Sequence, residues 1–267
     1  MSAVRLVVHG WIFAVALMLV LWYVQKVKRD AGVVDLGWCA GIGIVVLYYA
    51  FFSGGWLPRR ILVTALVCMW AFRLAAYILV DRVLRAPTED GRYRHLRSRW
   101  GERADFYFFF FFESQTLLVS LFSIPVLVLL RNPRASFSPW EAAGVVLWIV
   151  SIAGESAADR RLARFRADPK SRGRTCREGL WRYSRHPNYF FEWLHWWSYV
   201  AMAVGAPHGW LTLLGPAVML FFLLVVTGIP YTEAQALRSR GEDYREYQRT
   251  TSAFVPWFPR EKRRGGQ

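Results

Sequence analysis

The sequence predicts an all-α fold: a polytopic membrane bundle of about seven transmembrane helices, forming a single membrane domain over residues 1–267. Three observations support this prediction, namely the apolar content, its clustering into long stretches, and the placement of the basic residues. Hydrophobic residues make up 55% of the chain and aromatic residues 17%, more than a soluble globular protein carries. The composition therefore argues against a soluble domain.

Seven stretches are long and apolar enough to cross a hydrocarbon core, which needs about 20 helical residues. They are residues 5–25, 33–52, 61–80, 106–130, 140–157, 189–206 and 210–229. The longest polar connections are residues 81–105 and 158–186. A further polar helix is predicted over residues 231–251, before a tail that contains two prolines in FVPWFPR.

The net charge of +15 is distributed unevenly along the chain. Of the 34 Lys and Arg residues, 28 follow the odd-numbered spans and five lie on the alternate side. By the positive-inside rule, this bias predicts an outside N-terminus and a cytoplasmic C-terminus. Topology and anionic membrane lipids account for the charge, so no nucleic-acid partner is expected.

Ionisable side chains within predicted spans are costly and therefore mark candidate functional positions. They are Asp35, Arg73, Glu113, Glu155, Glu192 and His195. Two structural alternatives stay open at this point: a buried ion pair between Asp35 and Arg73, and glutamates that simply face water at the ends of their helices. The spacing of His, Cys and carboxylate residues predicts no metal site.

The densest polar signal is the segment GLWRYSRHPNYFFEWLHWW (179–197). Pro187 precedes a span, so the neighbouring polar residues lie at a helix N-terminus, which favours anions. Asn188 and Glu192 are one helical turn apart and can face one ligand. Nearby arginines suit phosphate, although a basic row at the headgroup level is equally typical of membrane proteins.

These segments resemble the bacterial DUF1295 family of the steroid 5-alpha-reductase-like membrane superfamily. The resemblance rests on VDLGW (34–38), FRLAAY (72–77), EDGRYRHLRSRWG (89–101), GLWRYSRHPNYFFEW (179–193) and EDYREYQRTTSAFVPWFPR (242–260). It implies an integral protein of a bacterial inner membrane. It also implies an NADPH-dependent reductase of a carbon–carbon double bond conjugated to a carbonyl, acting on a steroid-like or other lipid substrate.

The C-terminal half is also similar to isoprenylcysteine carboxyl methyltransferases, which bind S-adenosylmethionine. Their RHPxY segment is usually followed by x-Gly-Trp, whereas Asn188, Tyr189 and Glu192 match the reductase pattern. An S-adenosylmethionine-dependent lipid or prenyl methyltransferase therefore remains the alternative. A lipid-binding membrane protein without enzymatic activity is the second alternative.

The resemblance assigns the cofactor to residues 158–260 and implies a set of cofactor-binding side chains. They are Asp159, Arg166, Tyr183, Arg185, His186, Asn188, Glu192, Tyr231, Arg238 and Tyr244. The choice of NADPH over NADH rests on the abundance of arginine, which suits a 2′-phosphate.

The steroid enzymes polarise the substrate carbonyl with a Gln-Glu pair on the second span and a Tyr on the third. This sequence departs there, because the second span offers Asp35 and Trp70 stands where the Tyr is expected, three residues before Arg73. We therefore expect Asp35, as a protonated acid, to polarise the carbonyl together with Arg73. Tyr77 is the reserve candidate.

Overall fold

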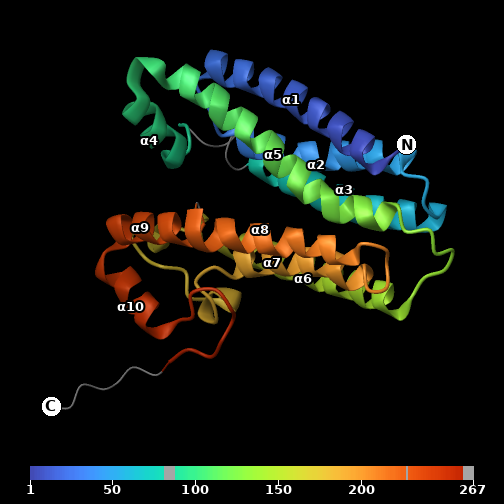
Figure 1. Cartoon of the computed structure of the whole chain (residues 1–267). Coiled ribbons are helices and arrows are strands. Elements are labelled where there is room, and N and C mark those ends of the chain that lie inside the picture. The colour runs from blue at the N-terminus through green and yellow to red at the C-terminus, as the bar shows by residue number, and fades with distance from the viewer. Residues whose placement is uncertain (81–87, 227, 261–267) are drawn as a thin grey trace. The chain divides into compact units, whose positions relative to one another are not determined.

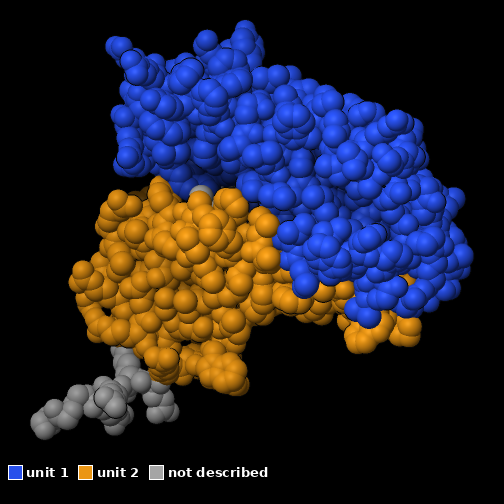
Figure 2. All heavy atoms as spheres, viewed as in Figure 1, with its two compact units in different colours: residues 1–138, 203–214 blue, residues 139–202, 215–267 orange. Residues whose placement is uncertain are grey.

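The computed structural model describes residues 1–80, 88–226 and 228–260, and every named element in these ranges is a helix. The chain divides into two compact units (Figure 2). The first comprises Met1–Ser138 with Ala203–Leu214, and the second comprises Pro139–Met202 with Gly215–Gln267. The single membrane domain expected from the sequence stays a prediction.

In the first unit, four long helices lie side by side (Figure 1): α1 (Ala3–Lys28), α2 (Val33–Phe52), α3 (Leu57–Ile78) and α5 (Ala104–Leu130). Helices α2 and α5 each pack against the other three. Tyr49 of α2 is fully buried, and the Tyr49 hydroxyl lies 3.2 Å from Ser123 Oγ of α5. Gly10 allows α1 to approach closely, since a Cβ there would lie 2.7 Å from the same hydroxyl.

A short helix, α4 (Gly91–Trp100), precedes α5. Its N-cap is Asp90, whose side chain accepts a hydrogen bond of 2.9 Å from the Arg92 N–H. Trp100 packs edge-on against Phe108 of α5, with ring centroids 4.9 Å apart. Much of the polar connection predicted at 81–105 is thus helical, and its first residues, 81–87, lie outside the described residues.

The second unit contains α6 (Pro139–Ala167), α7 (Pro187–Met202), α8 (Leu214–Phe221), α9 (Ile229–Arg240) and α10 (Glu242–Thr250). The helices α6 and α7 pack along each other in opposite directions. At one end of this contact, a Cβ on Gly144 would lie 2.4 Å from Met202 Cγ. At the other end, Asn188 hydrogen-bonds Asp159. This pairing brings the first turn of α7 beside the polar end of α6.

The all-α membrane fold class is confirmed. Six helical stretches of the described chain are long and apolar enough to cross a membrane: Ala3–Lys28, Val33–Phe52, Leu57–Ile78, Gly91–Leu130, Pro139–Ala167 and Gly209–Arg240. The span predicted at 189–206 corresponds to α7, which has 16 residues and extends about 24 Å at 1.5 Å per residue. The count of seven spans is therefore not confirmed. Thr227, within the last predicted span, lies outside the described residues.

Two boundaries predicted from the sequence are wrong. The polar helix expected at 231–251 is two helices, because Gly241 separates α9 from α10 with a positive φ of 53°. Helix α6 continues past the predicted end at 157 to Ala167. The apolar stretch ends where the charged residues begin, whereas the backbone hydrogen bonds of α6 continue through Arg160 and Arg164.

Candidate functional site

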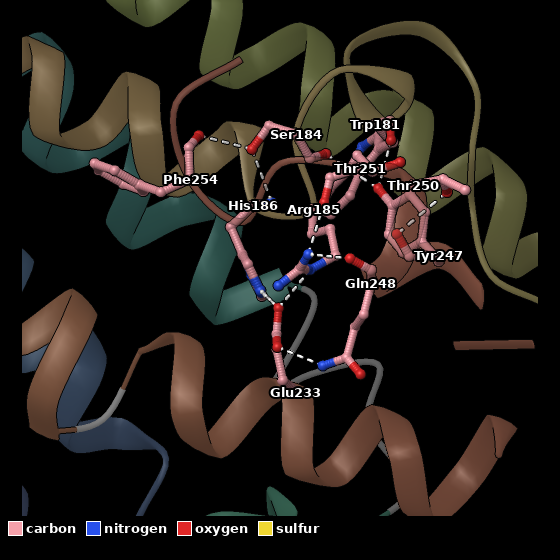
Figure 3. Close-up of polar contacts among 10 residues, drawn as sticks. All are labelled: Trp181, Ser184, Arg185, His186, Glu233, Tyr247, Gln248, Thr250, Thr251 and Phe254. Carbon is pink, nitrogen blue, oxygen red and sulfur yellow. Dashed lines mark hydrogen bonds and ion pairs between the residues drawn. The ribbon is translucent and has the colours of Figure 1, made fainter. Parts of the chain in front are cut away.

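Glu233 of α9 is the centre of a buried polar cluster in the second unit (Figure 3). Its Oε1 accepts hydrogen bonds from Arg185 Nε at 2.7 Å and His186 Nε2 at 3.2 Å. Its Oε2 accepts from Gln248 Nε2 of α10 at 2.6 Å. Burial, and then the charge of Glu233, raise the pKa of the Tyr244 phenol of α10, so its hydroxyl stays protonated. One carboxylate thus joins the loop before α7 to α9 and α10.

Arg185 holds the C-terminal residues in place with the rest of its guanidinium group. Its Nη1 donates to the carbonyl oxygens of Gln248 at 3.0 Å and Thr251 at 2.6 Å. The Arg185 backbone N–H donates to Ser252 O at 2.8 Å. Because the N–H donors of a guanidinium group point in fixed directions, Arg185 can bind a carboxylate and two carbonyl oxygens at once, which a lysine cannot do. Only 12% of the Arg185 side chain is exposed.

Further hydrogen bonds fasten the loop before α7 on both sides. Ser184 Oγ donates to Phe254 O at 2.8 Å, and the hydroxyl of Tyr247 donates to Ser184 O at 3.0 Å and to Trp181 O. Trp181 Nε1 donates to Ala158 O of α6 at 2.9 Å. The loop is therefore a rigid connection between α6, α10 and the chain that follows α10.

His186 is buried and its ring stacks on Tyr189, with centroids 5.3 Å apart. Burial lowers the pKa of His186, and the contact with Glu233 opposes this shift without reversing it. A neutral ring facing a carboxylate carries its hydrogen on Nε2, since the carboxylate can only accept. His186 is thus a neutral donor within the cluster.

The first turn of α7 carries the polar residues that the sequence singled out. Asn188 Nδ2 donates to Asp159 Oδ1 of α6 at 3.1 Å. Glu192 follows one turn later and is buried, as is Glu155 on the facing helix α6. An amide and carboxylates therefore lie together at this end of the α6–α7 pair.

The other predicted cofactor residues differ in exposure. Arg166 at the end of α6 and Arg238 on α9 are exposed to solvent. Tyr183 and Tyr231 are half-buried. The structure thus brings Arg185, His186 and Tyr244 together around Glu233, while Arg166 and Arg238 project from the surface. Their roles in cofactor binding stay predictions.

Sequence reasoning missed Glu233 and Gln248. Arg185 and Glu233 are 48 residues apart, and Glu233 and Gln248 are 15 apart on two different helices. No periodicity connects such positions. The one available signal was that Glu233 is a lone carboxylate in the stretch 229–240, facing an arginine-rich loop elsewhere in the chain.

In the first unit, Asp35 of α2 is bound by two residues of α4. Arg92 Nη2 lies 2.7 Å from Asp35 Oδ2, and the Tyr93 hydroxyl donates to Asp35 Oδ1 at 2.7 Å. Asp90 also binds Arg92, with its Oδ1 3.2 Å from Nε. Both oxygens of Asp35 act as acceptors here, whereas the sequence analysis expected an acid that donates.

The remaining predicted catalytic residues lie on α3. Arg73 and Tyr77 are both half-buried near its C-terminal end. Trp70 is fully buried and packs edge-on against Trp38 of α2, with centroids 5.9 Å apart. Trp70 thus fills the interface between α2 and α3. Tyr93, which the sequence analysis did not single out, is the phenol that contacts Asp35.

The apolar helices and their polar clusters define a polytopic helical membrane protein. Residues 21–251 match the family profile described as "Protein of unknown function (DUF1295)", so the chain belongs to this steroid 5-alpha-reductase-like membrane family. An uncharacterized protein of Schizosaccharomyces pombe (strain 972) is 27% identical over 218 residues, which cover 72% of this chain and 63% of that protein. The chain therefore spans less than two thirds of that relative's length. No solved structure matches the chain.

Replacing Glu233 by glutamine should destabilise the second unit, because it leaves Arg185 without its carboxylate partner. Breaking a buried ion pair costs about 3 kcal/mol. We expect a lower thermal midpoint, measured by circular dichroism on protein purified in detergent. Glu242→Gln is the matched control, since Glu242 forms only exposed ion pairs with Arg245 and Arg249, worth under about 1 kcal/mol. Equal losses in both variants would contradict the central role of Glu233.

Stability should fall as the pH drops below the value at which His186 titrates in the unfolded chain, about 6.5. Its pKa is lowered in the folded protein, so the unfolded state binds more protons below that pH and acid favours unfolding. The measurement is the thermal midpoint between pH 8 and pH 5. His186→Gln should flatten this dependence, while His95→Gln, at an exposed position, should leave it unchanged.

Proposed function

We propose that this protein is an NADPH-dependent membrane reductase of a carbon–carbon double bond conjugated to a carbonyl in a lipid-like substrate. The observation that carries the proposal is the polar group at the first turn of α7, where Asn188 meets Asp159 and Glu192 follows one turn later. These are the positions that match the reductase motif. Membership of a steroid 5-alpha-reductase-like family supports the same activity.

The residues in this region fit a nicotinamide dinucleotide. A carboxamide needs both a donor and an acceptor, and the amide of Asn188 with the carboxylates of Asp159 and Glu192 offers both. The exposed guanidinium groups of Arg166 and Arg238 suit the phosphates. The cluster around Glu233 would keep α9 and the loop before α7 in fixed positions beside them.

NADPH, when bound, supplies a hydride to the β carbon of the conjugated double bond. The chain must then stabilise the negative charge that develops on the carbonyl oxygen and provide a proton for the α carbon. In the first unit, Asp35 orients the Tyr93 hydroxyl and the Arg92 guanidinium group. Asp35, Arg73 and Tyr77 remain the catalytic candidates from the sequence.

The orientation of the chain in the membrane follows from the uneven distribution of its basic residues. We propose that the segments following α1, α3 and α6, together with α10, face the cytoplasm, because 28 of the 34 basic residues follow the odd-numbered predicted spans. Access from the cytoplasm would supply NADPH. The substrate would enter from the membrane, which suits a lipid-like molecule.

Purified protein should bind NADPH in a fluorescence titration, and Asn188→Ala should raise the Kd about tenfold through the loss of one hydrogen bond to a charged or polar partner. Gln235→Ala, which removes an exposed amide on α9, is the matched control and should leave the Kd unchanged. Binding of S-adenosylmethionine in place of NADPH would favour the methyltransferase alternative. Binding of neither cofactor would favour a lipid-binding protein without turnover.

Asp35→Asn should lower the turnover of an enone substrate about 100-fold, as expected when a group that polarises the carbonyl is lost, while the Kd for NADPH stays near that of the unaltered protein. Turnover is measured as loss of NADPH absorbance across a panel of enones, steroids and unsaturated lipids. Comparing Tyr93→Phe with Tyr77→Phe identifies which phenol matters. Unchanged turnover in Asp35→Asn would remove Asp35 from the reaction.

A further inference from the structure

A cavity of about 490 Å³ lies where α10 meets the following residues 251–260, here called the C-terminal tail. Its lining residues include Arg185, Arg249, Arg260, Thr250 and Ser252. No acidic side chain of the described chain is among the lining residues. The volume is that of a small-ligand site, and the chemistry of the lining favours an anion with several oxygens.

The backbone fixes the arginines around this cavity. The Arg260 N–H donates to Thr250 O at 2.8 Å, which folds the tail back over the end of α10. Arg185 is held by Glu233 and by the carbonyls of Gln248 and Thr251. Arg249 forms an ion pair with Glu242, but both side chains are about two thirds exposed, so this pair is weak and readily exchanged. The cavity is therefore built before any ligand arrives.

The rim of the same cavity is apolar and faces outward. Val255 is 52% exposed, Trp257 70% and Phe258 76%. Three large apolar side chains exposed within four residues are unfavourable in water. Tryptophan beside arginine is instead typical of the interfacial region of a bilayer, where the ring lies among the headgroups.

The tail lies at the level where the chain passes from polar loop to apolar helix. The Phe254 ring packs against Phe190 and Trp193 in the first two turns of α7, with centroids 5.8 and 5.6 Å away. The Trp257 N–H donates to Tyr183 O, just before α7, at 2.9 Å. Because α7 packs along α6, a candidate span, its first turn marks the headgroup level of the membrane.

We propose that this cavity binds the phosphate headgroup of an anionic membrane lipid, with Trp257 and Phe258 against the upper part of its acyl chains. The exposed guanidinium groups of Arg249 and Arg260 supply charge-assisted hydrogen bonds to the phosphate oxygens. A lipid is favoured over free phosphate because the apolar rim adjoins the basic lining. Bound lipid would hold the tail against Arg185 and so stabilise the cluster around Glu233. The proposal does not depend on the reductase activity.

The test is displacement of a fluorescent phosphatidylglycerol from full-length protein purified in detergent. We expect unlabelled dioctanoyl phosphatidylglycerol to displace the probe. Dioctanoyl phosphatidylcholine, whose choline cation is repelled by the arginines, and inorganic phosphate, which lacks the apolar contact, should each require at least about tenfold higher concentrations. Arg260→Gln should raise the Kd of the probe about tenfold. Arg245→Gln is the matched control, because it removes an exposed charge from α10 outside the cavity lining.

Several outcomes would overturn the proposal. Equal displacement by inorganic phosphate would identify a site for free phosphate. Equal weakening by Arg260→Gln and Arg245→Gln would show attraction to a diffuse basic surface rather than to a cavity. Trp257→Ser, at an exposed position, should preserve the thermal midpoint measured without lipid but weaken binding of the fluorescent lipid. Unchanged binding of this lipid in the variant would exclude contact between Trp257 and the acyl chains.

Discussion

The ion pair between Arg185 and Glu233 is the interaction on which the polar half of the second unit depends. Apolar contacts join α9 to α10, and others join the loop before α7 to α6. The Glu233 carboxylate of α9 receives donors from the loop before α7 and from α10. Removing it would leave a guanidinium group buried without a counter-charge, which costs more than the pair contributes when intact.

The same pair changes how the arginines of this region are understood. From the sequence, Arg185 and His186 are candidates to bind a cofactor phosphate. In the structure their donors are directed to Glu233 and to backbone carbonyls, so they maintain the shape of the loop. Exposed arginines such as Arg166 and Arg238 are better suited to a soluble anion, because their charge can be neutralised without breaking an existing buried contact. The proposed cofactor site and the cluster around Glu233 thus use different side chains.

In the first unit, the role of Asp35 also differs from the one that its residue type suggests. A lone carboxylic acid in an apolar helix suggests a buried proton donor. With Arg92 at 2.7 Å and the Tyr93 hydroxyl at the same distance, Asp35 is an acceptor that orients two donors. These two contacts link α4 to α2 through one carboxylate.

The sequence by itself determined the class of protein, the approximate spans and the polar first turn of α7. These are local properties: apolar length is read directly from consecutive residues, and Asn188 with Glu192 share a face because they are one turn apart. Tertiary structure decided the partners of Arg185, which is 48 residues from Glu233, and of Asp35, which is 57 residues from Arg92. It also decided the break at Gly241, where a positive φ ends a helix that composition alone would continue. Contacts between distant residues depend on how the helices pack, and no repeat along the chain encodes that packing.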